Sequence, residues 1–102
     1  MDIVLKFEAL CDQGKFEEAS TMLTDDFRFT NPRTDLDKPR WLKDFPALHA
    51  GKPTFSEFQP GANDNQVTRK GKKRIMMMNI EMIETWEVTD DGKIKSITGA
   101  KA

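Results

Sequence analysis

The sequence predicts an α+β fold in which helices come first and an antiparallel sheet follows. Apolar residues recur at helical spacing through the first 23 residues, whereas residues 66–98 contain strand-like runs separated by turn signals. In the apolar-rich run 75–88, alternate residues give a strand one nearly continuous apolar face, interrupted only by Glu84. We therefore expect one domain, residues 1–102, built around a long strand at 75–88.

Two helices are expected at the N-terminal end. Apolar residues spaced by four and seven positions predict a first helix over 3–11, and Gly14 suits the left-handed conformation that often follows a helix. A second helix is expected over 16–23, because its apolar residues share one face and two glutamates stand near its start. The polar residues 24–26 are expected to close this helix.

A third, short helix is expected near the middle of the chain. Residues 33–40 are mostly polar and predict a loop until Asp37, which is a candidate N-cap. The apolar side chains of 41–45 then give the helix a face to bury. Pro46 is expected to kink or stop it, because proline lacks the backbone donor and clashes with the preceding turn. Residues 47–53 are expected to form a connector.

Five runs of the sequence predict strands, at 27–30, 54–59, 66–69, 75–88 and 93–98. Asn31-Pro32 is expected to end the first of them, and residues 60–65 form the clearest loop signal. Lys70-Gly71-Lys72 is expected to turn the chain into the long strand. Residues 89–92 mark a hairpin, with glycine at a position that favours positive φ. The last three strands are expected to pair as an antiparallel meander.

Composition excludes several classes of protein. The chain has 37% hydrophobic and 32% charged residues and a net charge of -1, so it is globular and has no overall charge that selects a nucleic acid or a membrane. No run approaches the roughly 18 apolar residues of a membrane span. A single cysteine, Cys11, excludes an intrachain disulfide and suits a reducing compartment. We expect a cytoplasmic protein without a cofactor.

Two segments resemble a known family. The N-terminal part contains ALCDQGKFEEASTMLTDDFRFTNP, with helix–Gly–helix, paired acids before a strand, and a polar residue before proline. The C-terminal part contains TWEVTDDGKIKSI, with an aromatic-rich strand, an Asp-Gly hairpin and a final strand. In this order the pieces resemble the nuclear transport factor 2-like superfamily, which includes ketosteroid isomerases and SnoaL-like polyketide cyclases. The resemblance covers most of the chain and is weakest over 33–65.

The resemblance implies a cone-shaped, strongly curved antiparallel sheet wrapped around three N-terminal helices, a cystatin-like α+β roll. The cone of this family holds an apolar pocket that opens at one end, and homodimers through the outer face of the sheet are common. Besides Glu84, the residues that we expect to line the pocket are Phe7, Phe27, Phe29, Asn31, Trp41, Met78, Ile80, Met82 and Trp86.

The resemblance also places the catalytic groups of ketosteroid isomerases, and two of three are missing. Asn31 stands where that branch has its general base, and an amide cannot abstract a proton. The chain has no tyrosine, so the oxyanion donor of the first helix is absent as well. The acid that cyclases carry on the final strand has no counterpart in 95–99. Both activities are therefore disfavoured.

The third group survives as Glu84, two residues before Trp86. In an apolar pocket, desolvation would raise the pKa of this carboxyl and let it donate a hydrogen bond while protonated. The alternatives are that Glu84 pairs with a basic or hydroxyl neighbour, or that a β-bulge turns it outward. Glu84 is the one candidate catalytic residue.

The other polar or reactive residues have plainer interpretations. Asp25 and Asp26 most often cap or solvate a helix end. His49, the one histidine, has no partner with metal-ligand or catalytic-triad spacing, so we expect a surface or pocket-rim residue and no metal site. Cys11 lies on the stripe of the first helix and is expected in the core.

Residues 69–74 contain five basic side chains. They are a candidate nuclear-localisation or nucleic-acid patch, but a solvated hairpin tip is the favoured interpretation, since no aromatic residues are interleaved for base stacking. Nucleic acid is therefore not an expected partner. Ile75, Met77 and Ile83 would lie on the outer sheet face, and we expect a homodimer to cover them.

The sequence thus leaves two functions open. The first is a small-molecule-binding cone domain with an apolar pocket, acting as a binder or as an isomerase or lyase without the family's usual base. The second is a non-catalytic protein-interaction or dimerisation module of the nuclear transport factor type. An open interior with Glu84 inside it favours the first, and a filled interior with an exposed apolar rim favours the second.

Overall fold

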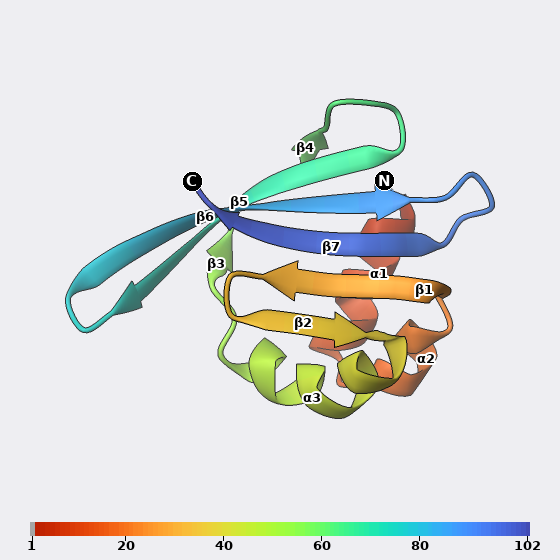
Figure 1. The fold of residues 1–102 in the computed structure, drawn as a ribbon, viewed down its shortest axis with the longest axis horizontal. Coiled ribbons are helices and arrows are strands. Elements are labelled where there is room, and N and C mark those ends of the chain that lie inside the picture. The colour runs from red at the N-terminus through yellow and green to blue at the C-terminus, as the bar shows by residue number, and fades with distance from the viewer. Residues whose placement is uncertain (1) are drawn as a thin grey trace.

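A computed structural model describes residues 2–102, which form three helices and a seven-stranded sheet (Figure 1). The elements, in chain order, are α1 (Asp2–Asp12), α2 (Phe16–Ser20), β1 (Leu23–Asn31), β2 (Thr34–Asp37), α3 (Lys38–Ala50), β3 (Thr54–Phe55), β4 (Gln59–Pro60), β5 (Gln66–Ile75), β6 (Met78–Val88) and β7 (Ile94–Lys101). No helix among these residues is long and apolar enough to cross a membrane.

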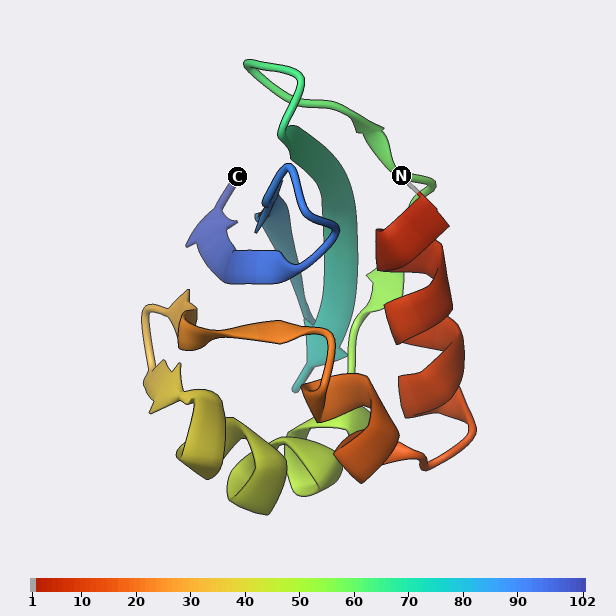
Figure 2. The same cartoon turned by 90° about the vertical axis from the view of Figure 1, so that its right-hand side faces the viewer.

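The sheet has the strand order β2-β1-β7-β6-β5-β3, and β4 also pairs with β5. It curves so that the helices lie on its concave side (Figure 2). The predicted α+β class with a curved sheet around three helices is confirmed. One detail differs, because β1 and β7 run parallel while every other neighbouring pair is antiparallel.

The region between α2 and α3 contains more strand than the sequence predicted. Leu23 is buried and pairs with Ile94, so β1 begins at residue 23 and includes the acidic residues that were expected to close the helix. The expected loop at 33–36 is instead most of β2, which pairs antiparallel with β1 from Asn31↔Thr34 to Arg28↔Asp37. Pairing between strands here outweighs weak local signals.

The sequence predicted that Pro46 would kink or stop this helix; α3 continues through Pro46 to Ala50, so the proline does not stop it. One face of the helix carries Trp41, Phe45 and His49, whose ring centroids lie 4.9 Å and 5.5 Å apart in succession. This packed aromatic row holds the helix together across the missing hydrogen bond. The predicted N-cap is confirmed, since the Asp37 side chain accepts a hydrogen bond from the Arg40 amide at 3.0 Å.

Most of the expected long strand at 75–88 is confirmed as β6, Met78–Val88, whereas Ile75 is the last residue of β5. The chain reverses at Met76-Met77, both with positive φ, and β5 pairs with β6 in unbroken register from Ile75↔Met78 to Gln66↔Glu87. Residues 70–72 are therefore not a turn. A Cβ atom on Gly71 would lie only 2.8 Å from a ring carbon of Phe55, so only glycine lets this ring pack against the strand.

The basic run 69–74 consequently lies along β5 and not at the hairpin tip. Its side chains alternate between the two faces of the sheet, and Arg69 points inward and is buried. The tip itself is apolar, and it projects beyond the rest of the molecule (Figure 1). Met76, Met77 and Met78 are exposed there.

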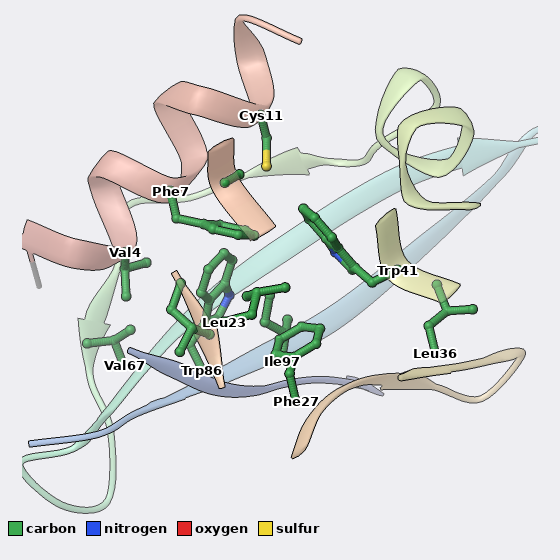
Figure 3. Packing of buried hydrophobic residues seen from close by; sticks show 12 residues of the cluster. Val4, Phe7, Cys11, Leu23, Phe27, Leu36, Trp41, Val67, Trp86 and Ile97 are labelled. Carbon is green, nitrogen blue, oxygen red and sulfur yellow. The ribbon is translucent and has the colours of Figure 1, made fainter. Parts of the chain in front are cut away.

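The core lies between α1, α3 and the sheet. Phe7 contacts Trp41 and Trp86, with ring centroids 5.4 Å and 5.5 Å away (Figure 3). Phe27 packs against Trp41 from β1. Burial of such aromatic rings contributes roughly 1.5–3 kcal/mol each to folding. Cys11 belongs to this core as predicted, and burial raises the pKa of its thiol to about 12, which makes it a poor nucleophile.

Candidate functional site

A pocket of about 390 Å³ opens beside the core, between α3, the segment 51–55 and strands β1, β5, β6 and β7. Its walls are largely apolar and include Phe29, Phe45, Ile80, Met82 and Ile97. The volume falls in the range of roughly 300–1,000 Å³ that is typical of small-molecule sites. The interior beside the core is therefore open.

An ion pair lies at the inner end of the pocket, where the lining residues are buried. Arg69 on β5 and Glu84 on β6 are cross-strand partners, both line the pocket, and each is only 8% exposed. The Arg69 Nε donates to Glu84 Oε1 at 2.8 Å. A second guanidinium nitrogen of Arg69 donates to Oε1 of Glu8 at 2.7 Å, which ties α1 to the sheet.

Aromatic rings surround the Arg69 guanidinium. Its central carbon lies 3.6 Å from the ring centroid of Phe55, 4.7 Å from that of Phe58 and 5.4 Å from that of Trp86. Each of these faces attracts the cation, and together they exclude water from it. Arg69 is thus held between two carboxylates and three rings, in one orientation.

Glu84 accepts a second hydrogen bond on the same oxygen. The indole Nε1 of Trp86 donates to Glu84 Oε1 at 2.6 Å. No donor among residues 2–102 bonds Oε2, and Glu84 lines the pocket, so Oε2 is the oxygen that a ligand can reach. The side chain is fixed through one oxygen and available through the other.

Burial raises the pKa of the Glu84 carboxyl, although Arg69 and the Trp86 bond oppose this. The direction matches the sequence-based expectation, but the charged neighbour was expected only as an alternative. Because Oε1 accepts both bonds, a proton taken up by Glu84 would sit on Oε2. The protonated form would then donate a hydrogen bond into the pocket, and the charged form would accept one.

The mouth of the pocket is basic. The exposed side chains of Arg33, Lys52, Lys73 and Lys101 line it, whereas its two acidic lining residues are Glu8 and Glu84 at the inner end. Lys73 Nζ also donates to the Gly51 carbonyl at 2.8 Å.

A histidine–carboxylate pair lies on the same rim. Nε2 of His49 lies 3.0 Å from Oδ1 of Asp12, which also accepts from Lys52 Nζ at 2.7 Å. The hydrogen bond from Lys52 lowers the pKa of Asp12. His49 is therefore a pocket-rim residue, one of the two positions expected for it.

The structure brings together six of the residues expected in the site: Phe29, Asn31, Ile80, Met82, Glu84 and Trp86 line the pocket. The other four do not line it. Phe7, Phe27 and Trp41 are fully enclosed by one another and by the core, and the Nε1 of Trp41 has no hydrogen-bond partner within residues 2–102. Met78 lies one residue past the tip turn and is 68% exposed, because the strand that carries it has left the body of the molecule.

Sequence reasoning missed Arg69 and Glu8. Arg69 was placed in a basic hairpin tip because the turn was assigned to 70–72. With the turn at 76–77, residues whose numbers sum to 153 face each other, and this register pairs Arg69 with Glu84 directly. Glu8 carries no such signal, because its contact depends on how α1 crosses the sheet.

No protein-family model and no curated protein matches the sequence. Solved structures do match. An NTF2-like protein of unknown function from Cytophaga hutchinsonii superimposes with a TM-score of 0.72 at 18% identity, over 99% of this chain and 88% of that one. The chain has the NTF2-like fold. The family resemblance of the sequence is thereby confirmed as a likeness of fold.

Two further solved structures with this fold show the range of proteins that share it. A steroid delta-isomerase from Pseudomonas aeruginosa has a TM-score of 0.75 at 14% identity, over 97% of this chain and 76% of that one. A Mycobacterium tuberculosis protein in complex with estradiol-17β-hemisuccinate has a TM-score of 0.70 at 15% identity, over 95% and 88%. Since one fold carries many functions, the function must be argued from the pocket.

Proposed function

We propose that the protein binds a small, largely apolar molecule in the pocket, with Glu84 as the polar anchor. The observation that carries this proposal is the open cavity of about 390 Å³ that reaches a buried carboxylate with one unbonded oxygen. Fixed, buried polar groups in an apolar pocket orient a ligand at little entropic cost. The mycobacterial structure with a bound steroid ester supports the same use of the fold.

Binding is better supported than catalysis. Glu84 can act as an acid or as a hydrogen-bond donor when protonated, but Asn31, which also lines the pocket, can only donate or accept hydrogen bonds. An isomerase or lyase would need a base from another group. Binding requires nothing beyond the groups already placed in the pocket.

A neutral fluorescent probe tests the proposal. We expect N-phenyl-1-naphthylamine to bind the wild-type protein and to gain fluorescence in the pocket. Ile80→Trp should abolish the gain, because Ile80 lines the cavity and an indole would fill it. Ile83→Trp is the matched control, since Ile83 is on the opposite face of β6 and adds the same bulk outside.

Two results would contradict the proposal. One is a wild-type protein that does not bind the probe at all. The other is equal binding by Ile80→Trp and Ile83→Trp, provided both variants show the circular dichroism of the folded wild type.

A second function, as a self-associating interaction module, is favoured by the apolar tip of the β5–β6 hairpin. The expectation that Ile75, Met77 and Ile83 form one outer patch is wrong, because Ile75 faces the pocket and Met77 lies in the turn. Around Ile83 the outer face carries Lys70, Glu81 and other polar residues. If the chain forms a homodimer, we propose that the tip residues 76–78 supply the contact.

A further inference from the structure

Basic and acidic side chains are distributed unevenly along the pocket. Arg33, Lys73 and Lys101 are exposed lining residues at the mouth, and within residues 2–102 none of them forms a salt bridge. The acidic lining residues lie at the inner end, where Arg69 is bonded to both. The mouth is therefore positive, although the whole chain has a net charge of -1.

We propose that the ligand is an amphiphilic organic monoanion, such as a carboxylate or sulfonate, whose apolar body fills the pocket and whose anionic group stays at the mouth. The proposal rests on the proposed function. Low-dielectric walls concentrate the field of charges around a cleft, so the mouth attracts an anion more strongly than the same basic side chains would on a flat surface.

The inner end sets the orientation. An anion cannot replace the pairing of Arg69, because Glu8 and Glu84 already occupy it and three rings cover the guanidinium. A further negative charge would be repelled here, because Glu8 and Glu84 already share the one buried guanidinium. The charged group of the ligand must therefore point outward, and the end near Glu84 Oε2 must be neutral.

Two probes with the same aromatic body separate the charge from the apolar contact. 1-Anilinonaphthalene-8-sulfonate carries the anion, and N-phenyl-1-naphthylamine lacks it. We expect the double substitution Arg33→Gln with Lys101→Gln to weaken binding of the sulfonate about fivefold, in line with two solvated charge contacts, and to leave the neutral probe unchanged. High salt should reduce sulfonate binding by the wild type more than by the double variant, which retains Lys73 at the mouth.

The matched control is Arg40→Gln with Lys43→Gln, which removes the same charge from α3 outside the pocket lining. Sulfonate binding that survives Ile80→Trp would come from another surface and would overturn the inference. So would a control variant that weakens the sulfonate as much as the mouth variant does, or a mouth variant that affects both probes equally. If neither probe binds the wild type, the proposed function fails as well.

Discussion

Arg69 and Glu84 determine both the stability and the chemistry of the pocket's inner end. A buried ion pair is near break-even against apolar residues of the same volume, but removal of one partner leaves an uncompensated charge at a cost of about 3–5 kcal/mol. Here the arrangement contains two carboxylates and one guanidinium, all joined by bonds of 2.7–2.8 Å. Burial of the Glu84 carboxyl raises its pKa more than Arg69 and the Trp86 bond lower it, and the negative charge of Glu8 adds to the rise.

This raised pKa predicts how stability changes with pH. Between the ordinary value of 4.5 and the raised value, the folded chain holds a proton on Glu84 that the unfolded chain has lost. The unfolding free energy of the wild type should therefore fall as pH rises through this window, relative to Glu84→Gln. The expected fall is about 1.4 kcal/mol for each unit by which the pKa is raised. Urea titrations of both proteins across the window measure it.

Subtraction of the Glu84→Gln curve removes groups common to both proteins, such as Asp12, whose lowered pKa acts in the opposite direction. A difference that grows with pH would mean that Arg69 holds the carboxylate charged. The anchor would then accept a hydrogen bond from the ligand instead of donating one. If the difference in unfolding free energy does not change with pH, the pKa of Glu84 is not shifted on folding.

At the scale of elements, the sequence predicts what local pattern decides. The apolar stripe of α1, the N-cap at Asp37 and the Asp-Gly hairpin before β7 are confirmed, since each depends on a few neighbouring residues. Features that depend on distant partners were missed. Strand β2 exists because β1 pairs with it, and α3 continues past Pro46, where Phe45 packs against Phe16 of α2 and Phe29 of β1.

Among the pocket residues, too, local sequence pattern predicted some features and could not predict others. Residue alternation along β6 correctly placed Ile80, Met82, Glu84 and Trp86 on one inward face. How deep each side chain lies is set by the bend of the sheet and by the rings that fill its base, which no local pattern reports. Phe7 and Trp41 consequently belong to the core.

The turn between β5 and β6, which the sequence placed at 70–72, has an unfavourable backbone conformation at residues 76–77. Met76 and Met77 have φ of 48° and 70°, values that fit a type I′ turn and that normally require Asn or Gly. A left-handed conformation costs roughly 1–2 kcal/mol for a residue with a side chain. The combined change Met76→Asn with Met77→Gly should therefore raise the unfolding free energy by about 1–2 kcal/mol. Urea denaturation measures the gain.

Met77→Ala serves as the control, because it removes the exposed side chain and keeps the strained φ. A gain of the same size in Met77→Ala would show that the benefit comes from loss of apolar surface. An unchanged or lower stability in the double variant would contradict the turn geometry.

The whole molecule separates two surfaces that serve different purposes. The pocket runs from a closed, paired end to a basic mouth, while the β5–β6 hairpin carries apolar side chains away from the body (Figure 1). The two share strands, so the arm that forms one wall of the pocket also presents the tip. A strained backbone together with exposed apolar side chains is typical of a segment that binds a partner.

The tip therefore predicts the mode of self-association. Met76 and Met77 are 91% and 86% exposed, against 38% for Ile83 on the outer sheet face. In sedimentation velocity at micromolar concentration we expect a wild-type dimer, because burial of these thioether side chains would contribute about 1.5–3 kcal/mol each. Met76→Ser with Met77→Ser should shift the equilibrium to monomer, whereas Ile83→Ser should leave the dimer intact. A monomeric wild type would contradict self-association, and dissociation only in Ile83→Ser would move the contact to the outer face.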